Sequence, residues 1–236
     1  MSTIVSIQAR LGSTRLPNKM KLSLGGETVL SWVIKRASLS NEVDLVVLAL
    51  PDTPENDELE MVAQSLGCLT YRGSENDVLE RLTLSVREYQ PDNVVRLCAD
   101  RPLVDPTVLD DTVKFFRDRY KANQPIDLAF SHQAGRGADW PFGFGVEVLS
   151  YSCLERLNEI VTDPFEREHV TLHLWNHSDR YQIKPLPCPS AYSILGPNAK
   201  LDLDTSTDFL RLKKLILSPE DVRLPGYEFI TRALNI

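Results

Sequence analysis

The loop between Arg10 and Lys19 carries the side chains with the clearest chemistry in this chain. Three cations, Arg10, Arg15 and Lys19, flank a Gly-Ser-Thr turn at residues 12–14. The loop follows the apolar run 3–8, at the point where a first β-strand would end. A parallel sheet binds ligands at the carboxyl ends of its strands, and backbone N–H groups of a glycine turn suit phosphate oxygens. The sequence therefore predicts a polyphosphate site, and we interpret its ligand as a nucleoside triphosphate.

The local charge agrees with an anionic ligand. Residues 1–40 hold six Lys or Arg and one acid, although the whole chain has a net charge of −7. The alternative is an ordinary surface loop with solvated cations. The loop is neither a Walker P-loop nor a dinucleotide-binding loop, since the chain contains neither G-x-x-x-x-G-K-[ST] nor G-x-G-x-x-G.

Two aspartates, Asp100 and Asp204, follow strand-like runs at 93–97 and 200–203. A parallel sheet would bring such strand ends together. Hard Mg²⁺ prefers carboxylate, phosphate and water oxygens, but spacing alone fits a helix-capping or turn role equally well. Asp202-Leu-Asp204 also has the D-x-D form of metal-dependent glycosyltransferases, so a sugar transferase that uses a nucleotide sugar is an alternative function.

Three histidines, His169, His173 and His177, lie at i, i+4 and i+8 on one face of an expected helix. This spacing is compatible with zinc ligation. We favour a helix-end role for His177 over zinc ligation. Asn176-His177 has the form of a helix end, where the helix dipole favours histidine.

Glycines and aromatic residues alternate over residues 135–144, which include Trp140, Phe142 and Phe144. Such a stretch could form an aromatic rim over a bound sugar. Exposed aromatic residues also mark contacts between subunits. We favour the subunit contact and expect a homodimer.

Strand and helix patterns alternate over the first 130 residues. Strands are expected at 3–8, 43–50, 68–71, 93–97 and 127–131. Helices are expected around 30–37 and at 55–66, 76–89 and 107–120. This alternation predicts an α/β fold, Rossmann-like, with three α/β/α layers around a mostly parallel sheet.

The second half of the chain has a less regular pattern. We expect strands at 144–149, 181–184 and 200–203, the last of them short. Helices are expected at 151–161, 165–176 and 206–216, and Thr205 would cap the last of these. Residues 185–197 are expected to form a loop, and residues 218–236 a packed tail. One domain over residues 1–236 is expected. Its parts are a nucleotide-binding part of about 1–130, an inserted acceptor and dimerisation lobe of about 132–185, and a metal-binding return of about 198–217.

The composition, with 42% hydrophobic and 25% charged residues, is typical of a globular protein. No apolar run approaches the roughly 20 residues of a membrane span, and no secretory leader is evident. Cys68, Cys98, Cys153 and Cys188 are scattered, as expected for free thiols in a reducing cytoplasm. The pI of about 5.2 disfavours a nucleic-acid partner. We expect a cytoplasmic protein with no membrane partner.

Five stretches, in order, resemble the sugar-acid cytidylyltransferases, a family that includes the acylneuraminate and CMP-Kdo synthetases. They are residues 8–19, 72–81, 96–105, 166–171 and 203–208. The resemblance is strongest to the spore coat polysaccharide biosynthesis protein F type. It implies a nucleotidyltransferase fold and transfer of CMP from CTP to a sugar or sugar acid, with release of pyrophosphate. The motifs do not specify the acceptor.

The resemblance also implies roles for single residues. Arg10, Arg15 and Lys19 would stabilise the departing pyrophosphate, and Asp100 and Asp204 would hold Mg²⁺. Nucleotide contacts are expected at Gln8, Ala9, Arg10, Leu11, Gly12, Ser13, Lys19, Arg72, Ser74, Asp77, Ala99 and Asp100. Acceptor contacts are expected at Glu147, Arg167, Glu168 and His169. Ala99 replaces the family's usual glycine and Cys98 its usual threonine; the extra methyl of Ala99 narrows the approach of a ligand to the backbone.

The expected reaction is direct attack by an acceptor hydroxyl on the α-phosphate of CTP. It depends on positioning and charge neutralisation, so a Ser-His-Asp or Cys-His nucleophile is not needed. The alternatives are the glycosyltransferase above and a catalytically inactive nucleotide-binding scaffold. The presence of Lys19, Asp100 and Asp204 favours an enzyme.

Overall fold

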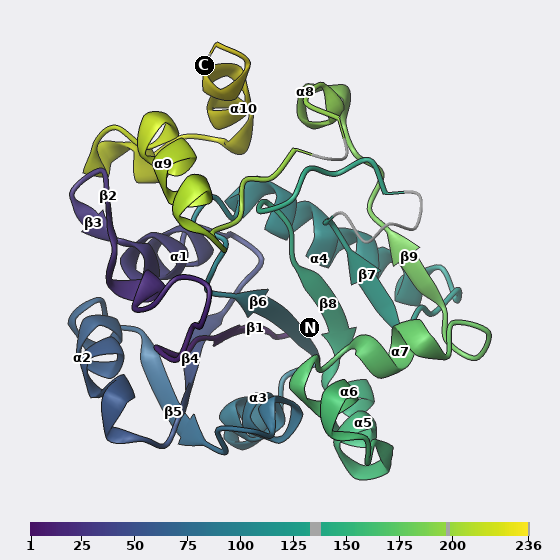
Figure 1. Ribbon diagram of the computed structural model, residues 1–236. Helices are drawn as coiled ribbons and strands as arrows, with labels where there is room; N and C mark the ends of the chain where they lie inside the picture. The colour runs from purple at the N-terminus through teal and green to yellow at the C-terminus, as the bar shows by residue number, and fades with distance from the viewer. Residues whose placement is uncertain (133–137, 197–198, 236) are drawn as a thin grey trace.

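Seven strands form one sheet in the order β5-β4-β1-β6-β8-β7-β9 (Figure 1). The structure is a computed structural model that describes residues 1–132, 138–196 and 199–235. The strands are β1 (Thr3–Gln8), β4 (Leu45–Pro51), β5 (Leu69–Gly73), β6 (Asn93–Cys98), β7 (Leu128–Phe130), β8 (Glu147–Ser150) and β9 (Ile183–Pro185). All neighbouring strands pair in parallel except β8, which is antiparallel to both β6 and β7. A hairpin of β2 (Ser23–Leu24) and β3 (Glu27–Thr28) stands apart from this sheet.

Helices cover both faces of the sheet. The longer helices are α1 (Val29–Ala37), α2 (Asp57–Ser65), α3 (Val78–Val86), α4 (Pro106–Lys121), α5 (Tyr151–Ile160), α9 (Ser206–Leu215) and α10 (Gly226–Leu234). The short ones are α6 (Pro164–Glu168), α7 (Leu172–Asn176), α8 (Ser190–Ser193) and the 3-10 turns η1 (Lys19–Lys21), η2 (Pro54–Asn56), η3 (Arg87–Tyr89) and η4 (Pro219–Arg223). Among the described residues, no helix is long and apolar enough to cross a membrane.

Alternation along β1 divides the core into two layers. Val5 and Ile7 belong to a buried cluster with residues of α1, α2, α4, α9 and α10, whereas Ile4 belongs to a cluster with residues of α3, α5 and α7. Figure 1 shows α3 and α5 on the side of the sheet opposite to α9 and α10. Successive side chains of a strand point to opposite faces, so a run apolar at every position indicates burial on both. The predicted three-layer fold with a mostly parallel sheet is confirmed.

The structure corrects three predicted elements. The helix expected at 165–176 is two helices, α6 and α7, separated where Val170 adopts φ 56°. This left-handed conformation, uncommon for a β-branched residue, ends helical hydrogen bonding. The strand expected at 200–203 is wrong: only Lys200 forms a bridge, with Phe142. The loop expected at 185–197 contains α8.

Residues 132–185, expected to form an inserted lobe, contribute β8 and β9 to the same sheet. Two aromatic residues of this segment lie inside the protein. Trp140 and Phe144 are buried, and the Trp140 indole donates to the Leu186 carbonyl at 2.7 Å. The expectation of an exposed aromatic rim or contact is therefore wrong for these two residues, because both rings complete the core. Residues 135–137 of that stretch lie outside the described residues.

Candidate active site

The cationic loop follows β1 at the carboxyl edge of the sheet, as the sequence predicts. Its start is held on both sides, since the Ala9 amide donates to the Ala49 carbonyl and the Ala99 amide donates to the Gln8 carbonyl. The Leu11 amide donates to the buried Asn56 side chain at 3.1 Å. Asn18 then turns the chain with φ 56° into η1, which begins at Lys19. The sheet therefore fixes the start of the loop, and the turn at Asn18 leads its end into η1.

One ammonium group joins the two aspartates. Lys19 Nζ lies 3.2 Å from Asp100 Oδ2, 3.4 Å from Asp204 Oδ1 and 3.0 Å from the Leu203 carbonyl. Arg15 lies 3.0 Å from the same Asp204 oxygen and is largely exposed. Residues 19, 100 and 204 are far apart in sequence, so only the fold brings them together. Their roles toward a metal or a phosphate stay predictions.

Asp204 reaches Asp100 without the predicted strand. A backbone hydrogen bond of 2.8 Å from the Leu203 amide to the Asp100 carbonyl anchors the segment. Thr205 then caps α9 in a reciprocal capping box with Asp208. Gly143 allows the close backbone approach, because a Cβ there would lie 2.4 Å from the Leu201 carbonyl carbon. The predicted cap of α9 by Thr205 is confirmed. Isolated backbone contacts hold the segment before Asp204 in place of the expected strand.

The carboxylates suit a divalent cation. Burial raises the pKa of Asp204, but Lys19, Lys200 and Arg15 outweigh it and hold that pKa below its usual range. Burial, with Asp100 and Asp204 nearby, raises the pKa of Asp202. Asp202 Oδ1 is buried and finds no hydrogen-bond partner among the described residues. Oxygen donors of this kind are those that Mg²⁺ prefers, so the residues fit the predicted metal.

A pocket of about 340 Å³ opens beside this cluster. Nearly all of the predicted phosphate and metal residues line it, together with residues from α3 and β6. Its lining includes Gln8, Ala9, Arg10, Gly12, Ser13, Arg15, Lys19, Ala99, Asp100, Glu168, His169 and Asp204. The extra methyl of Ala99 thus lies in the pocket wall.

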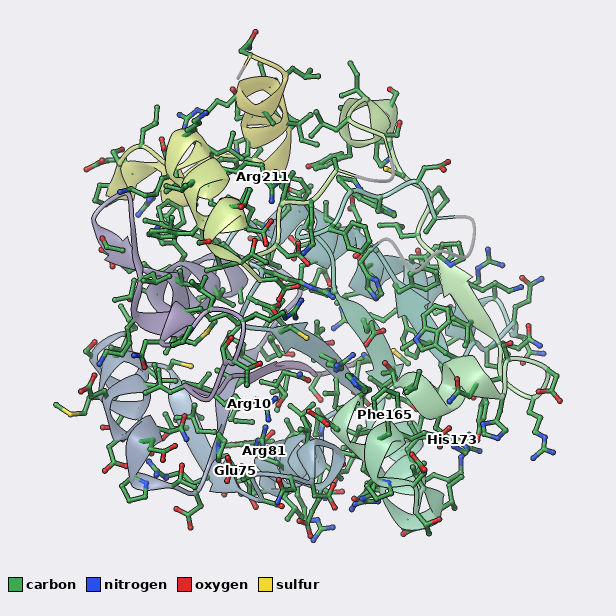
Figure 2. The ribbon with its side chains drawn as sticks, in the orientation of Figure 1. Arg10, Glu75, Arg81, Phe165, His173 and Arg211 are labelled. Carbon is green, nitrogen blue, oxygen red and sulfur yellow. The ribbon has the colours of Figure 1, made fainter. Side chains whose placement is uncertain are left out.

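Arg81 also lines the pocket and was not assigned from the sequence. It lies near Arg10 (Figure 2) and is buried on α3. Burial, with the Arg10 charge adding to it, lowers the pKa of Arg81 to about 10. Its Nη1 donates to the Ser74 carbonyl, while its buried Nε has no partner in the described structure. The sequence clue was an arginine on the apolar face of the expected helix 76–89.

Five predicted contacts line neither this pocket nor the second one described below. Arg72 forms ion pairs with Asp52, Asp57 and Glu60. Asp77 caps α3 through the Glu80 amide and pairs with Arg167 at 2.7 Å. All three Arg167 side-chain nitrogens contact protein acceptors. The remaining two are Leu11 and Ser74, whose hydroxyl accepts from the Asp77 amide. Of these residues, Asp77 and Ser74 contact the start of α3, which contributes Val78 and Arg81 to the pocket.

A second pocket, of about 320 Å³, adjoins the first and shares Arg96 and His169 with it. Its other lining residues are Glu147, Phe165, Thr171, Leu172 and Trp175. Glu147 is buried and pairs with Arg96 at 2.7 Å and with His132 at 3.1 Å. Arg96 Nε donates to Gln8 at 3.0 Å. Predicted acceptor residues Glu147 and His169 therefore line one cavity beside the cationic pocket.

The fold and the site define a class of protein: a doubly wound nucleotide-binding sheet with a cationic loop and paired carboxylates at its carboxyl edge, as in nucleotidyltransferases. A family model described as cytidylyltransferase matches residues 4–136. The chain belongs to this cytidylyltransferase family.

The chain is similar to three proteins in particular. It is 32% identical over 215 residues to the spore coat polysaccharide biosynthesis protein SpsF of Bacillus subtilis, covering 89% of this chain and 84% of that protein. It is 30% identical over 115 residues to the 3-deoxy-manno-octulosonate cytidylyltransferase of Chloroherpeton thalassium, covering 48% and 45%. A solved cytidylyltransferase from Leptospira borgpetersenii superposes with TM-score 0.88 at 27% identity, covering 100% of this chain and 94% of the other. The predicted resemblance is confirmed, and it favours nucleotidyl transfer over the glycosyltransferase alternative.

Proposed function

We propose that this cytidylyltransferase transfers CMP from CTP to a hydroxyl of a sugar or sugar acid in a Mg²⁺-dependent reaction. The observation that carries the proposal is the cluster in which Lys19 joins Asp100 and Asp204 at the edge of a pocket lined by Arg10, Arg15 and Arg81. Cations suit the triphosphate of CTP, and carboxylate oxygens suit the ion that accompanies it.

The bond changes are simple. The acceptor oxygen bonds to the α-phosphorus of CTP and the hydroxyl loses its proton, while the bond from that phosphorus to the bridging oxygen breaks and pyrophosphate leaves. Arg10, Arg15 and Lys19 would stabilise the charge on the leaving group. Asp100 and Asp204 would hold Mg²⁺, which polarises the phosphate when bound. Lys19, which faces both carboxylates in this structure, would then face phosphate oxygens.

The acceptor is proposed to bind in the second pocket. This pocket shares a wall with the first, so an acceptor there would lie beside the nucleotide. Phe165 and Trp175 offer apolar faces for the C–H groups of a sugar ring, and His169 offers a polar contact. Arg167 would act as a positioning residue that ties α6 to Asp77.

The test is pyrophosphate release from the four nucleoside triphosphates with a panel of sugars and sugar acids. We expect release with CTP, stimulated by an acceptor, abolished by EDTA and restored by Mg²⁺. Release that continues in EDTA would contradict the metal assignment. CTP binding without turnover on any acceptor would support the inactive scaffold instead.

The homodimer remains a separate proposal. Because Trp140 and Phe144 are buried, the support expected from these aromatic residues is lost. Leu210, Leu217 and Leu234, in the C-terminal part of the chain, are exposed and are alternative candidates for a subunit contact. Sedimentation velocity measures the assembly directly, and a monomer at all concentrations would contradict it.

A further inference from the structure

A second group of metal-ligating side chains lies where α6 meets α7, away from the cationic pocket. Glu166, His173 and His177 each offer one ligand atom, and these atoms lie within 4.8 Å of one another. Figure 2 shows His173 at the lower right, below α7 and far from Arg10 and Arg81. Neither of the two pockets described above includes any of these three residues.

The break in the predicted helix creates this group. Spacing alone places His169 in line with His173 and His177, but the turn at Val170 removes it to the wall of the two pockets. The same turn folds α6 back so that Glu166 contacts α7. His173 Nδ1 lies 2.6 Å from Glu166 Oε2, and the ring centroids of His173 and His177 are 4.2 Å apart.

Neighbouring groups already orient these ligands. The Asn176 side chain donates to Glu166 Oε1 at 2.8 Å, which fixes the carboxylate. His177 Nδ1 lies 2.9 Å from the His173 carbonyl, so it carries the proton. Its Nε2 then holds the lone pair that a metal needs, which is the usual state of a ligating histidine.

We propose that Glu166, His173 and His177 bind Zn²⁺, which clamps α6 to α7. Two imidazoles and one carboxylate form a set that zinc accepts with a fourth position open to water. Mg²⁺ prefers an all-oxygen shell and would not compete. The chain would thus hold two chemically distinct metals, one at the aspartates and one at this group.

The clamp bears on the acceptor pocket. Helices α6 and α7 are only five residues each, too short to be stable alone. Phe165 of α6, and Leu172 and Trp175 of α7, line the second pocket, with His169 between the two helices. Zinc that joins α6 to α7 would fix these residues relative to one another.

Binding needs only side-chain rotation. Two ligands on a tetrahedral zinc lie about 3.3 Å apart, given bonds of about 2.0 Å. The contact between Glu166 and His173 must open slightly as the zinc displaces its proton, and His177 must approach. Glu166 and His173 are 13% and 17% exposed, so an ion from solvent can reach both side chains.

The experiment uses the full chain stripped with EDTA and then held in excess Mg²⁺, which occupies carboxylate sites. Zn²⁺ is titrated by calorimetry, and Co²⁺ by the visible absorption of a tetrahedral ion. Wild type should bind a single ion per chain. His177→Ala and Glu166→Gln should weaken binding by more than about 10-fold, and Asn176→Ala by about 10-fold to 100-fold.

His169→Ala is the matched control, since it removes a histidine from the same segment and should leave zinc affinity unchanged. Circular dichroism checks that each variant is folded. Absence of saturable Zn²⁺ binding in wild type would overturn the proposal. Unchanged affinity in both His177→Ala and Glu166→Gln would overturn it as well. Neither result depends on pyrophosphate release, so this site and the proposed function fail independently.

Discussion

At the scale of single residues, Lys19 is the centre of the site. Its side chain is only 13% exposed, and it is shared between two carboxylates that would otherwise repel each other. Under the proposed function, a substrate that brings phosphate oxygens together with a divalent ion would satisfy all three groups at once. The Lys19 ammonium would then give up its place between the carboxylates to a metal–nucleotide complex.

Arg81 provides a test of the pocket at residue scale. Its Nε is buried and has no partner in the described structure, so we expect it to contact the nucleotide. Arg81→Met should raise the KM for CTP by about 10-fold to 100-fold, because this range corresponds to the free energy of a hydrogen bond to a charged group. Steady-state pyrophosphate release measures this. Arg87→Met, an exposed arginine just after the same helix, is the control, and equal KM values in the two variants would refute the assignment.

Glu147 provides a test through pH. Burial raises the pKa of its carboxyl, but Arg96 and His132 outweigh burial and hold the pKa well below its usual range. A carboxyl whose pKa is lower in the folded than in the unfolded state stabilises the fold at pH values above its unfolded-state pKa, near 4.5. This stabilisation is lost as the pH falls toward the folded-state pKa.

Glu147→Gln should therefore lower the free energy of unfolding by about 3 to 5 kcal/mol at pH 7, because Arg96 is left unpaired. The difference between wild type and variant should shrink below about pH 4. Urea denaturation at several pH values measures both effects. A difference that does not vary with pH would argue against the ionised pair.

At the scale of elements, the parallel half of the sheet was predictable, but the conformation of the segment that brings Asp204 to Asp100 was not. Strands such as β1 and β6 are rich in apolar residues, are buried at nearly every position and directly precede the site loops, so the sequence pattern located both. The segment before Asp204 is held instead by the Leu203–Asp100 hydrogen bond and by Gly143. Such tertiary contacts leave no local pattern. The turn at Val170 was equally invisible, because its neighbours have ordinary helical composition.

The contact at Gly143 gives a prediction at this scale. Its φ is 101°, and an added Cβ would meet the Leu201 and Asp202 backbone at 2.4 to 2.6 Å. Gly143→Ala should lower the free energy of unfolding by about 1 to 3 kcal/mol through strain alone, and should displace Asp204. Urea denaturation and pyrophosphate release measure the two effects. Gly12→Ala has no atom within 4 Å of its added Cβ and is the stability control; equal stability of both variants would contradict the argument.

At the scale of the whole molecule, the site joins distant parts of the chain. The loop after β1, the end of β6, the segment before α9 and helix α6 all meet at one edge of the sheet (Figure 1). A ligand that contacts all four segments stabilises the native state as a unit. The family motifs predicted most of these segments. Arg72 lies in such a motif but forms ion pairs outside the pocket, so a position in a motif does not distinguish a residue that lines the pocket from one that only forms structural contacts.

This arrangement predicts a nucleotide-dependent thermal stability. CTP with Mg²⁺ at about 100 times its Kd should stabilise the fold by about 2.7 kcal/mol, which corresponds to a rise in Tm of about 5 to 10 °C. Differential scanning fluorimetry measures the shift, with ATP as the comparison. A larger shift with ATP than with CTP would contradict cytidine selectivity.

The most direct test of the central claim compares two lysines of η1. Lys19 joins Asp100 and Asp204 inside the pocket, whereas Lys21 pairs with Glu58 at the surface. In Mg²⁺-dependent pyrophosphate release from CTP with an acceptor, Lys19→Ala should lower kcat/KM by about 100-fold to 1000-fold. Lys21→Ala should retain wild-type turnover. Near-normal turnover in Lys19→Ala, with Lys21→Ala unaffected, would contradict the account.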